Sequence, residues 1–122
     1  MLKKNKNLLL LIHHGPHGSQ QNAAALDFLL AAGTQQYNVS AVFCDDGVLA
    51  LLQDQQASKI QATDYSHNWQ ALPIYEINQR YVVENSLRER NLSINDLTIL
   101  VEPLSHQQLV DLLQQQDFIL RY

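Results

Sequence analysis

The sequence predicts an α/β fold in which a mainly parallel sheet carries helices on both faces. Two short apolar runs, Leu8–Ile12 and Val39–Cys44, stop at turn-forming residues, which is typical of strands that are buried on both faces. Each run is followed by a segment with helical character, and this alternation continues along the chain. With 122 residues the chain has the length of one domain, which we expect to span residues 1–122.

The first half of the chain holds a long apolar helix between two strands. Ser19 to Ala32 is rich in alanine and leucine, and Ser19 suits the helix N-cap. Gly33 suits the left-handed position just past the helix end. This helix has so little polar surface that we expect it to be covered on more than one side. After the second strand, Val48–Leu52 is predicted as one or two helical turns and residues 53–63 as a polar loop.

The second half continues the alternation with shorter elements. The predicted elements are a helix over Asp64–Leu72, a strand over Leu72–Ile77, a strand or helix lead-in over Arg80–Val83, a helix over Glu84–Arg90, a strand over Thr98–Glu102, a helix over Ser105–Gln116 and a strand over Phe118–Arg121. Asn91 tolerates the positive φ of a helix end, Pro103 is expected to terminate the strand before it, and Ser105 is a helix N-cap. Ligands collect beyond the carboxyl ends of parallel strands, so we look for functional residues there.

Composition excludes several classes of protein. The chain has 46% hydrophobic and 16% charged residues, which is typical of a globular domain. One cysteine closes no internal disulfide and builds no thiolate zinc site. A net charge of −4 argues against a surface that binds nucleic acid directly.

The N-terminus resembles an export signal in having basic residues before an apolar run, but this apolar run is too short. Three lysines precede the apolar run Leu8–Ile12, which has only five residues. A signal peptide needs an apolar core of about 7–15 residues and a membrane span about 20. We therefore expect a cytoplasmic protein with no membrane segment.

A histidine-rich turn follows the first strand. His13, His14 and His17 carry imidazoles of the kind that bind zinc. A proline and two glycines in the turn disfavour a helical pair of ligands, and no other cluster obviously supplies the remaining ones. The segment Gly15–Ser19 precedes a helix N-terminus and is a candidate anion cradle, although it matches neither common nucleotide-binding motif. We favour a strand-to-helix turn with hydrogen-bonded or exposed histidines, and we expect no metal and no cofactor.

Cys44, Asp45 and Asp46 end the second strand. The two carboxylates are expected to raise the pKa of the thiol and so to disfavour the thiolate that acts as a nucleophile. We therefore favour a buried, small apolar role for Cys44. The two aspartates are a candidate acid/base pair, but Asp-Gly after a strand is more typical of a turn.

Two arginines, Arg88 and Arg90, lie near the predicted end of a helix. Positive charge is favourable at that end, so a solvated helix face explains both side chains. The alternative is that they meet an acidic partner.

Four stretches of the chain, taken in order, resemble one family. They are Pro16-His17-Gly18 after the first strand, Asp46-Gly47-Val48 after the second, Ser86-Leu87-Arg88-Glu89-Arg90 in mid-chain and Phe118-Ile119-Leu120-Arg121-Tyr122 at the C-terminus. Together they resemble the DsrE/DsrF/DsrH family of sulfur-relay proteins, and within it the DsrF-like (TusC-type) subunits. The resemblance runs over essentially the whole chain and implies a three-layer α/β/α domain.

The resemblance also implies a place in a complex. Subunits of this type assemble with TusB-like and TusD-like subunits into a heterohexamer. That complex passes persulfide sulfur from a TusA-like donor towards a TusE-like acceptor and supports 2-thiolation of the wobble uridine of tRNA. The chain would then have no direct contact with nucleic acid, and its apolar helix over residues 19–32 would supply part of a subunit interface.

In the same family the sulfur-carrying cysteine belongs to the TusD-like subunit. Alignment through Ser86–Arg90 puts Val83 at that position, and valine forms no persulfide. The resemblance therefore implies a structural subunit without a catalytic residue, not an enzyme. Three alternatives stay open: Cys44 itself carries persulfide sulfur, the chain binds a small anion at Gly15–Ser19, or it serves a DsrEFH-type complex of sulfur oxidation.

Overall fold

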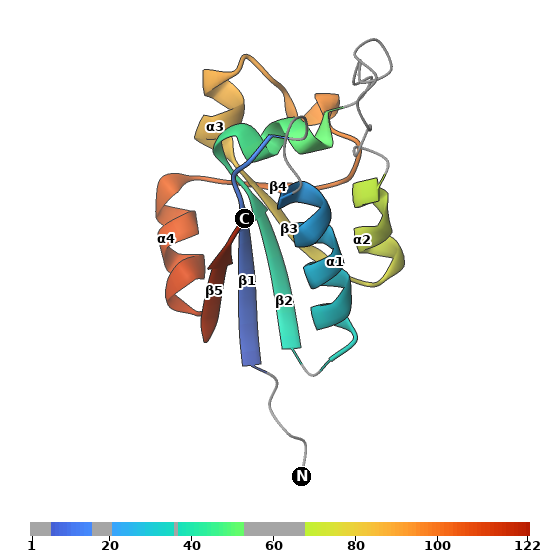
Figure 1. Ribbon diagram of the computed structural model, residues 1–122. Coiled ribbons are helices and arrows are strands. Elements are labelled where there is room, and N and C mark those ends of the chain that lie inside the picture. The colour runs from blue at the N-terminus through green and yellow to red at the C-terminus, as the bar shows by residue number, and fades with distance from the viewer. Residues whose placement is uncertain (1–5, 16–20, 36, 53–67) are drawn as a thin grey trace.

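The computed structural model describes residues 6–15, 21–35, 37–52 and 68–122, and the side chains of all of these except 21–23 and 68. At its centre a parallel sheet holds five strands in the order β4-β3-β2-β1-β5 (Figure 1). The strands are β1 (Lys6–Ile12), β2 (Tyr37–Phe43), β3 (Gln79–Val83), β4 (Glu102–Leu104) and β5 (Phe118–Arg121). In their ladders, Leu8 of β1 lies level with Val39 of β2 and with Phe118 of β5.

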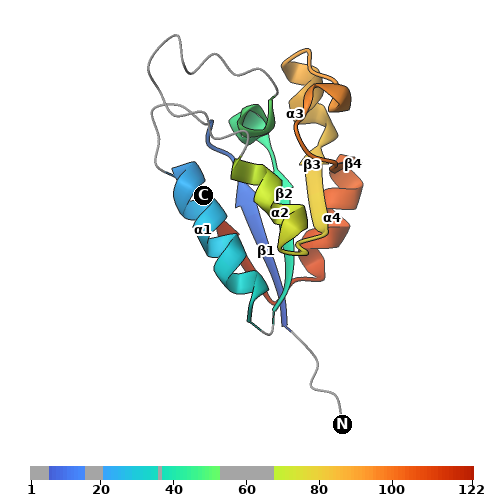
Figure 2. The same ribbon diagram turned by 90° about the vertical axis from the view of Figure 1, so that its right-hand side faces the viewer.

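Helices cover both faces of this sheet. They are α1 (Gln21–Gly33), α2 (Ala71–Ile74), α3 (Glu84–Glu89) and α4 (His106–Gln114), with 3-10 helices over Asp45–Leu51, Asn68–Gln70 and Ile94–Asp96. α1 and α2 lie on one face and α4 on the other, while α3 lies beyond the carboxyl ends of the strands (Figures 1 and 2). The predicted α/β fold with three layers is confirmed. No helix of the described residues combines the length and the apolar character that crossing a membrane requires.

The face under α1 and α2 carries the main hydrophobic core. Its strand residues are buried: Leu8, Leu10, Ile12, Ala41 and Phe43. These residues share a face because side chains alternate along a strand. Ala25 and Leu29 of α1 belong to the same cluster, and the ring of Phe43 meets Trp69 edge to face with centroids 5.0 Å apart. The core therefore ties α1 and the segment before α2 to the middle of the sheet.

The opposite face of the sheet is covered by α4, which packs less deeply than the helices of the main core. Leu9 and Val42 are fully buried on this face, yet no residue of α4 itself is fully buried. The helix begins with a capping box. The Ser105 hydroxyl accepts a hydrogen bond from the Gln108 amide, and the Gln108 side chain accepts one from the Ser105 amide. The predicted N-cap at Ser105 is confirmed.

The structure corrects the role predicted for Gly33. This glycine is the last residue of α1, and its backbone does not adopt the left-handed conformation expected just past a helix end. An added Cβ would lie 3.2 Å from the side chain of Ile77. Gly33 therefore serves close packing of the helix end against the segment that leads to β3.

Two predicted strands are also wrong: Leu72–Ile77, which contains Pro73, and Thr98–Glu102, expected to end before Pro103. Residues 72–77 form most of α2 and the turn after it, because Pro73 falls in the first turn of a helix, where no amide hydrogen is needed. The strand predicted over Thr98–Glu102 is instead β4, which includes Pro103. An edge strand tolerates proline because one side of its backbone makes no ladder bonds.

Other local predictions are confirmed or fall outside the described residues. Asn91 has a φ of 54° at the end of the α3 segment, as expected. The segment Arg80–Val83 is a strand, and Phe118–Arg121 is the last strand. Ser19, residues 53–63 and the start of the helix predicted over Asp64–Leu72 lie outside the described residues.

Gly47 allows the turn after β2 to rest on the end of β1. A Cβ added at Gly47 would overlap the carbonyl oxygen of Ile12. Two backbone hydrogen bonds hold this turn: the Cys44 amide donates to that carbonyl over 3.0 Å, and the Gly47 amide donates to the Cys44 carbonyl over 2.8 Å. No side chain fits at Gly47 unless β1 or the 3-10 helix moves.

Gly47→Ala should lower the free energy of unfolding by at least about 2 kcal/mol, because the new methyl group forces two backbone segments apart. Urea titration followed by circular dichroism measures the change. Gly15→Ala is the matched control. A Cβ at Gly15 would have its nearest neighbours at 3.8 Å, so that substitution should change the free energy by no more than about 0.5 kcal/mol. Equal effects of the two substitutions would contradict the steric argument.

Candidate functional site

The candidate residues lie at the carboxyl ends of three neighbouring strands. His13 follows β1, Cys44 follows β2, and Val83 is the last residue of β3. Phe43 is level with Val82 in the β2–β3 ladder, so Cys44 and Val83 stand one residue further along two adjacent strands. The sheet therefore places the thiol beside the position at which the family resemblance expects a sulfur-carrying cysteine.

The histidine turn lies where the order of the strands reverses. β2, β3 and β4 follow one another on one side of β1, whereas β5 lies on its other side, so the switch point is between β1 and β5. There the His13 amide donates to the carbonyl of Tyr122 over 2.8 Å. The rings of His13 and His14 lie 4.3 Å apart between centroids. His17 and the other residues of the candidate anion cradle, except Gly15, are outside the described residues.

The environment of His13 favours its neutral form. Burial lowers the pKa of this imidazole, and the positive charge of Arg121 and the neighbouring His14 lower it further. Since the folded chain binds this proton less readily than the unfolded chain, protonation below about pH 6.5 opposes folding. Among the described residues, no group of three or more potential ligands is gathered for a metal ion.

Cys44 is a weakly acidic, half-buried thiol. Burial raises its pKa to about 11, and the negative charge of Asp45 adds to the rise. The predicted direction of the pKa is therefore confirmed, although burial contributes more than the carboxylate. Asp46, the other carboxylate considered in the prediction, forms an ion pair with Arg90 instead. At neutral pH the side chain is a thiol and not a thiolate, which makes it a poor nucleophile.

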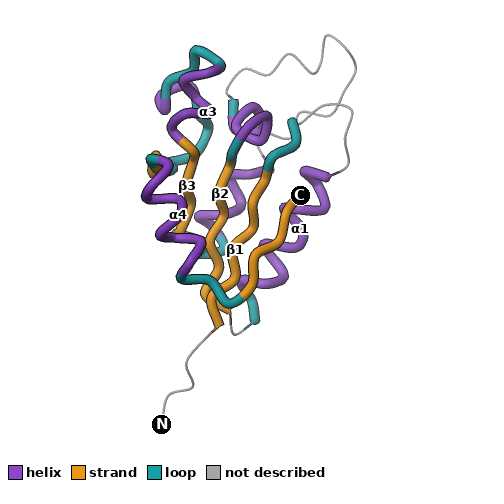
Figure 3. Tube along the Cα trace, turned by 90° about the vertical axis from the view of Figure 1, so that its left-hand side faces the viewer, coloured by secondary structure: helices purple, strands orange, loops and turns teal. Residues whose placement is uncertain are grey.

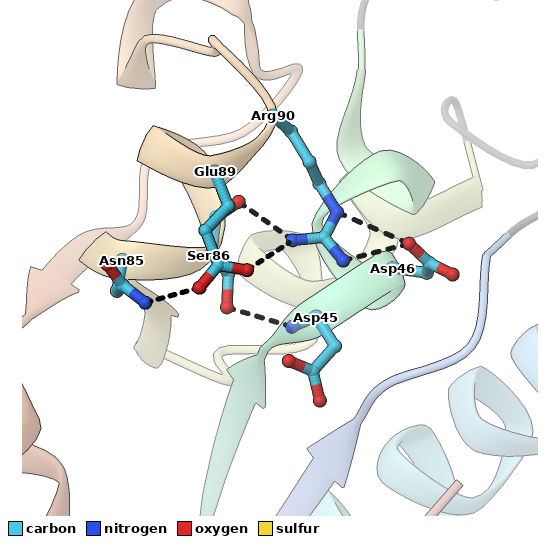
Figure 4. A network of polar contacts seen from close by, with 6 residues as sticks. All are labelled: Asp45, Asp46, Asn85, Ser86, Glu89 and Arg90. Carbon is cyan, nitrogen blue, oxygen red and sulfur yellow. Dashed lines mark hydrogen bonds and ion pairs between the residues drawn. The ribbon is translucent and has the colours of Figure 1, made fainter.

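Asp45 and Asp46 have separate roles in the turn after β2. Asp45 has a φ of 49°, and its amide donates to the hydroxyl of Ser86 over 2.9 Å. The Asp46 carboxylate instead meets the guanidinium of Arg90 (Figure 4). The two carboxylates point in different directions in this view, and the contacts of both residues tie the turn to α3.

Arg90 is the centre of this polar network. Its Nε and Nη2 atoms donate to one oxygen of Asp46 over 3.2 and 2.9 Å, and its Nη1 donates to the carbonyl of Ser86 over 3.1 Å (Figure 4). Its side chain is 23% exposed, whereas that of Arg88 is 69% exposed and pairs with Glu84 one helical turn away. Arg90 therefore meets an acidic residue of its own chain, 44 positions earlier.

Val83 presents no reactive group at the end of β3. It is half-buried and occupies the N-cap position of α3 without any side-chain cap. Ser86, the third residue of α3, is 4% exposed and contributes a hydroxyl to the network of Figure 4. Sequence reasoning named Ser86 only as part of a family stretch. It missed the contact of Ser86 with Asp45 and the pairing of Arg90 with Asp46, because each joins two segments that meet only in the folded chain.

Cys44 should react slowly with a small alkylating reagent. A pKa of about 11 in place of the ordinary 9 lowers the thiolate fraction at pH 8 about 100-fold. Mass spectrometry after timed exposure to iodoacetamide measures the rate, and the same chain unfolded in urea is the control. The folded rate should rise steeply up to about pH 11, and equal rates in the folded and unfolded chain at pH 8 would contradict the assignment.

Arg90→Ala should lower the free energy of unfolding by about 2 kcal/mol, because it leaves the Ser86 carbonyl and the Asp46 carboxylate without a charged donor. Arg88→Ala is the matched control on the same helix. Its ion pair with Glu84 is exposed to solvent, so its loss should cost no more than about 0.5 kcal/mol. Thermal and urea unfolding of both variants test the difference, and an Arg88 variant as unstable as the Arg90 variant would refute it.

Comparison with known proteins extends these observations over the whole chain. Residues 6–122 match the DsrE/DsrF-like family. A protein of Pseudomonas aeruginosa named "Protein TusC homolog" is 36% identical over 116 residues, which cover 95% of this chain and 98% of that protein. A protein of Vibrio parahaemolyticus with the same name is 35% identical over 115 residues, covering 94% and 98%.

One solved structure supports the fold independently. The ychN protein of E. coli superimposes with a TM-score of 0.80 over 96% of this chain and 99% of that chain, at 17% sequence identity. At this identity the likeness concerns the fold alone. The match across residues 6–122 and the two relatives of nearly equal length show that this chain belongs to the DsrE/DsrF-like family.

Proposed function

We propose that this chain is a non-catalytic structural subunit of a cytoplasmic TusBCD-type sulfur-relay complex that supports 2-thiolation of the tRNA wobble uridine. The observation that carries the proposal is the combination of two features. The chain resembles proteins named TusC homolog over nearly its whole length, and no thiolate stands at the carboxyl end of its sheet at neutral pH in the described residues. Its partners would be TusB-like and TusD-like chains in a heterohexamer.

The chemistry of a persulfide relay explains why the pKa of Cys44 matters. The accepting thiolate attacks the outer sulfur of the donor persulfide, the sulfur–sulfur bond breaks, and the donor leaves as a thiolate. No net oxidation occurs, but the attacking group must be deprotonated. Cys44 has a pKa of about 11, and Val83 has no sulfur, so neither suits the accepting role. The sulfur would therefore pass through the TusD-like partner, with a TusA-like donor and a TusE-like acceptor.

The surface of the chain suits a subunit of an assembly. Large apolar side chains are exposed at three places on the described residues. The first region is β5 with Tyr37, the second comprises the segment with Ile74 and Tyr75 and the segment with Leu100, and the third is Ile94. Arg80 links the two segments of the second region, since it donates to the carbonyls of Ile77 and Leu100. Exposed apolar patches of this kind mark protein interaction sites. The network of Arg90 would hold the carboxyl end of the sheet in a fixed shape for such a partner.

Co-expression with the TusB-like and TusD-like chains of the same organism tests the assembly. We expect the three chains to elute together from a size-exclusion column, because the exposed apolar side chains of this chain are then covered. This chain expressed with an unrelated α/β protein is the control. Elution apart from both partners would refute the proposal.

Sulfur transfer by the assembled complex tests the non-catalytic role. Cys44→Ser should leave the transfer of labelled sulfur to the TusE-like acceptor within about twofold of the unmodified complex, because the thiol is not the carrier. Serine in place of the reactive cysteine of the TusD-like partner is the matched control and should abolish transfer. Loss of transfer with Cys44→Ser would instead make this chain a persulfide carrier.

A further inference from the structure

The two edges of the sheet differ in how they are protected against pairing with another chain. β4 is only three residues long and carries Glu102 and Pro103, a charge and an imino acid that both discourage strand addition. β5 carries no proline, and its three apolar residues are exposed: Phe118 by 48%, Ile119 by 45% and Leu120 by 38%. Figure 3 shows this last strand beside β1, at the side of the sheet where the chain ends. Within the part of the chain that the structure describes, β5 is therefore the open edge.

The backbone of β5 presents its free hydrogen-bonding groups at fixed positions. The Tyr122 amide donates to Leu11, and the Tyr122 carbonyl accepts from His13, so the polar backbone groups of Tyr122 face β1. The backbone N–H and C=O groups of successive residues in a strand face alternate sides. The amides and carbonyls of Ile119 and Arg121 consequently face away from β1, towards the open edge. A partner strand would pair with these two residues.

The sequence around β5 is complementary to itself in one antiparallel register. In Asp117-Phe118-Ile119-Leu120-Arg121, a twofold axis at Ile119 places each Asp117 opposite Arg121 of a second copy and each Phe118 opposite a Leu120. A twofold axis at Leu120 would instead place Arg121 opposite an apolar Ile119. Charge complementarity therefore selects the register centred on Ile119. In this register the outward-facing backbone groups of Ile119 meet those of the second copy, while the Asp117 amide keeps its hydrogen bond to the Asn7 carbonyl.

The charged ends of this segment are available for such a contact. Asp117 and Arg121 are both exposed. One carboxylate oxygen of Asp117, Oδ2, accepts a hydrogen bond from the Asn7 amide over 2.7 Å. Its other oxygen accepts none from the described part of the chain, and Arg121 forms no ion pair there. An opposite charge from a second copy would satisfy both groups.

An apolar groove runs along the same edge. It has a volume of about 380 Å³, and its lining, which includes Phe28, Tyr37, Phe118 and Leu120, contains no charged residue. Phe118 and Leu120 lie on the α1 face of the strand, where Phe118 meets the ring of Tyr37 with centroids 6.2 Å apart. Antiparallel pairing would bring two such grooves together across the twofold axis, which adds apolar burial to the hydrogen bonds.

We propose that two copies of this chain associate through their β5 edges, antiparallel and centred on Ile119, with Asp117 of each copy paired with Arg121 of the other. The two sheets then continue into one sheet of ten strands. This contact goes beyond the proposed function, since it joins like subunits and needs neither sulfur nor a TusB-like or TusD-like chain.

Sedimentation equilibrium of the purified full chain tests the contact. We expect a reversible dimer at micromolar concentration. Arg121→Asp should raise its Kd at least about tenfold, because it places two carboxylates opposite each other. Asp117→Arg should do the same, and the double charge swap should restore the affinity. Arg88→Asp, the same change of charge on α3, is the control and should leave the Kd unchanged.

A proline at the axis tests the backbone pairing. Ile119→Pro removes an amide that faces the open edge, so the monomer should fold while dimerisation is lost. Circular dichroism confirms folding for each variant. Because Asp117→Arg also removes the acceptor of the Asn7 amide, Arg121→Asp and Ile119→Pro decide the test if that variant does not fold.

Three results would overturn the proposal. The first is a monomeric unmodified chain, and the second is a dimer that Arg121→Asp and Ile119→Pro leave intact. The third is stronger association after Arg121→Leu, which would show that Arg121 opposes strand pairing at the β5 edge. Recovery of TusB-like and TusD-like partners by a chain that is itself monomeric would refute this contact and leave the proposed function standing.

Discussion

The close approach of Gly47 to the Ile12 carbonyl governs the end of the sheet at which chemistry would occur. Because Gly47 has no side chain, the 3-10 helix after β2 packs directly on the end of β1. That packing places the Asp45 amide at the Ser86 hydroxyl and the Asp46 carboxylate at the Arg90 guanidinium. These contacts join α3 to the same turn. Three strand ends and one helix therefore form a single rigid edge, although they come from distant parts of the sequence.

The rigidity of this edge has a chemical consequence for Cys44. The turn that fixes the thiol also buries it and places Asp45 beside it, and both effects favour the protonated form. A cysteine used for sulfur transfer needs solvent access and a net positive environment. At Cys44 the positive charges of Arg121 and Arg90 lower the pKa by less than burial and Asp45 raise it. The position next to Cys44 on β3 is a valine. The surroundings of Cys44 and the valine beside it thus agree with the supporting role proposed above.

The sheet also has one protected and one open edge, and this asymmetry is a property of the whole fold. The proline that a central strand would exclude is accommodated in β4. β5 returns to the opposite side of β1 after α4, and its three apolar residues are exposed there. Exposed apolar surfaces of this kind suit the subunit role proposed above.

Local patterns in the sequence were sufficient for much of this fold. The apolar runs at Leu8–Ile12 and Val39–Cys44 identified central parallel strands, since burial on both faces leaves no polar alternation. Ser105 and Asn91 marked helix ends because their own side chains or backbone preferences act over a few residues. Pro103 misled, since whether a missing amide matters depends on the position of the strand in the sheet.

Only the tertiary structure decided what lies around the candidate residues. The pairing of Arg90 with Asp46 spans 44 positions, and the approach of Gly33 to Ile77 spans a comparable distance along the chain. No local pattern encodes such contacts, because they arise when the sheet brings separate turns together. The sequence by itself thus determined the class of fold and the direction of the Cys44 pKa. The sheet order and the packing of its turns decided the extent of that burial, the open edge at β5 and the network that holds the strand ends.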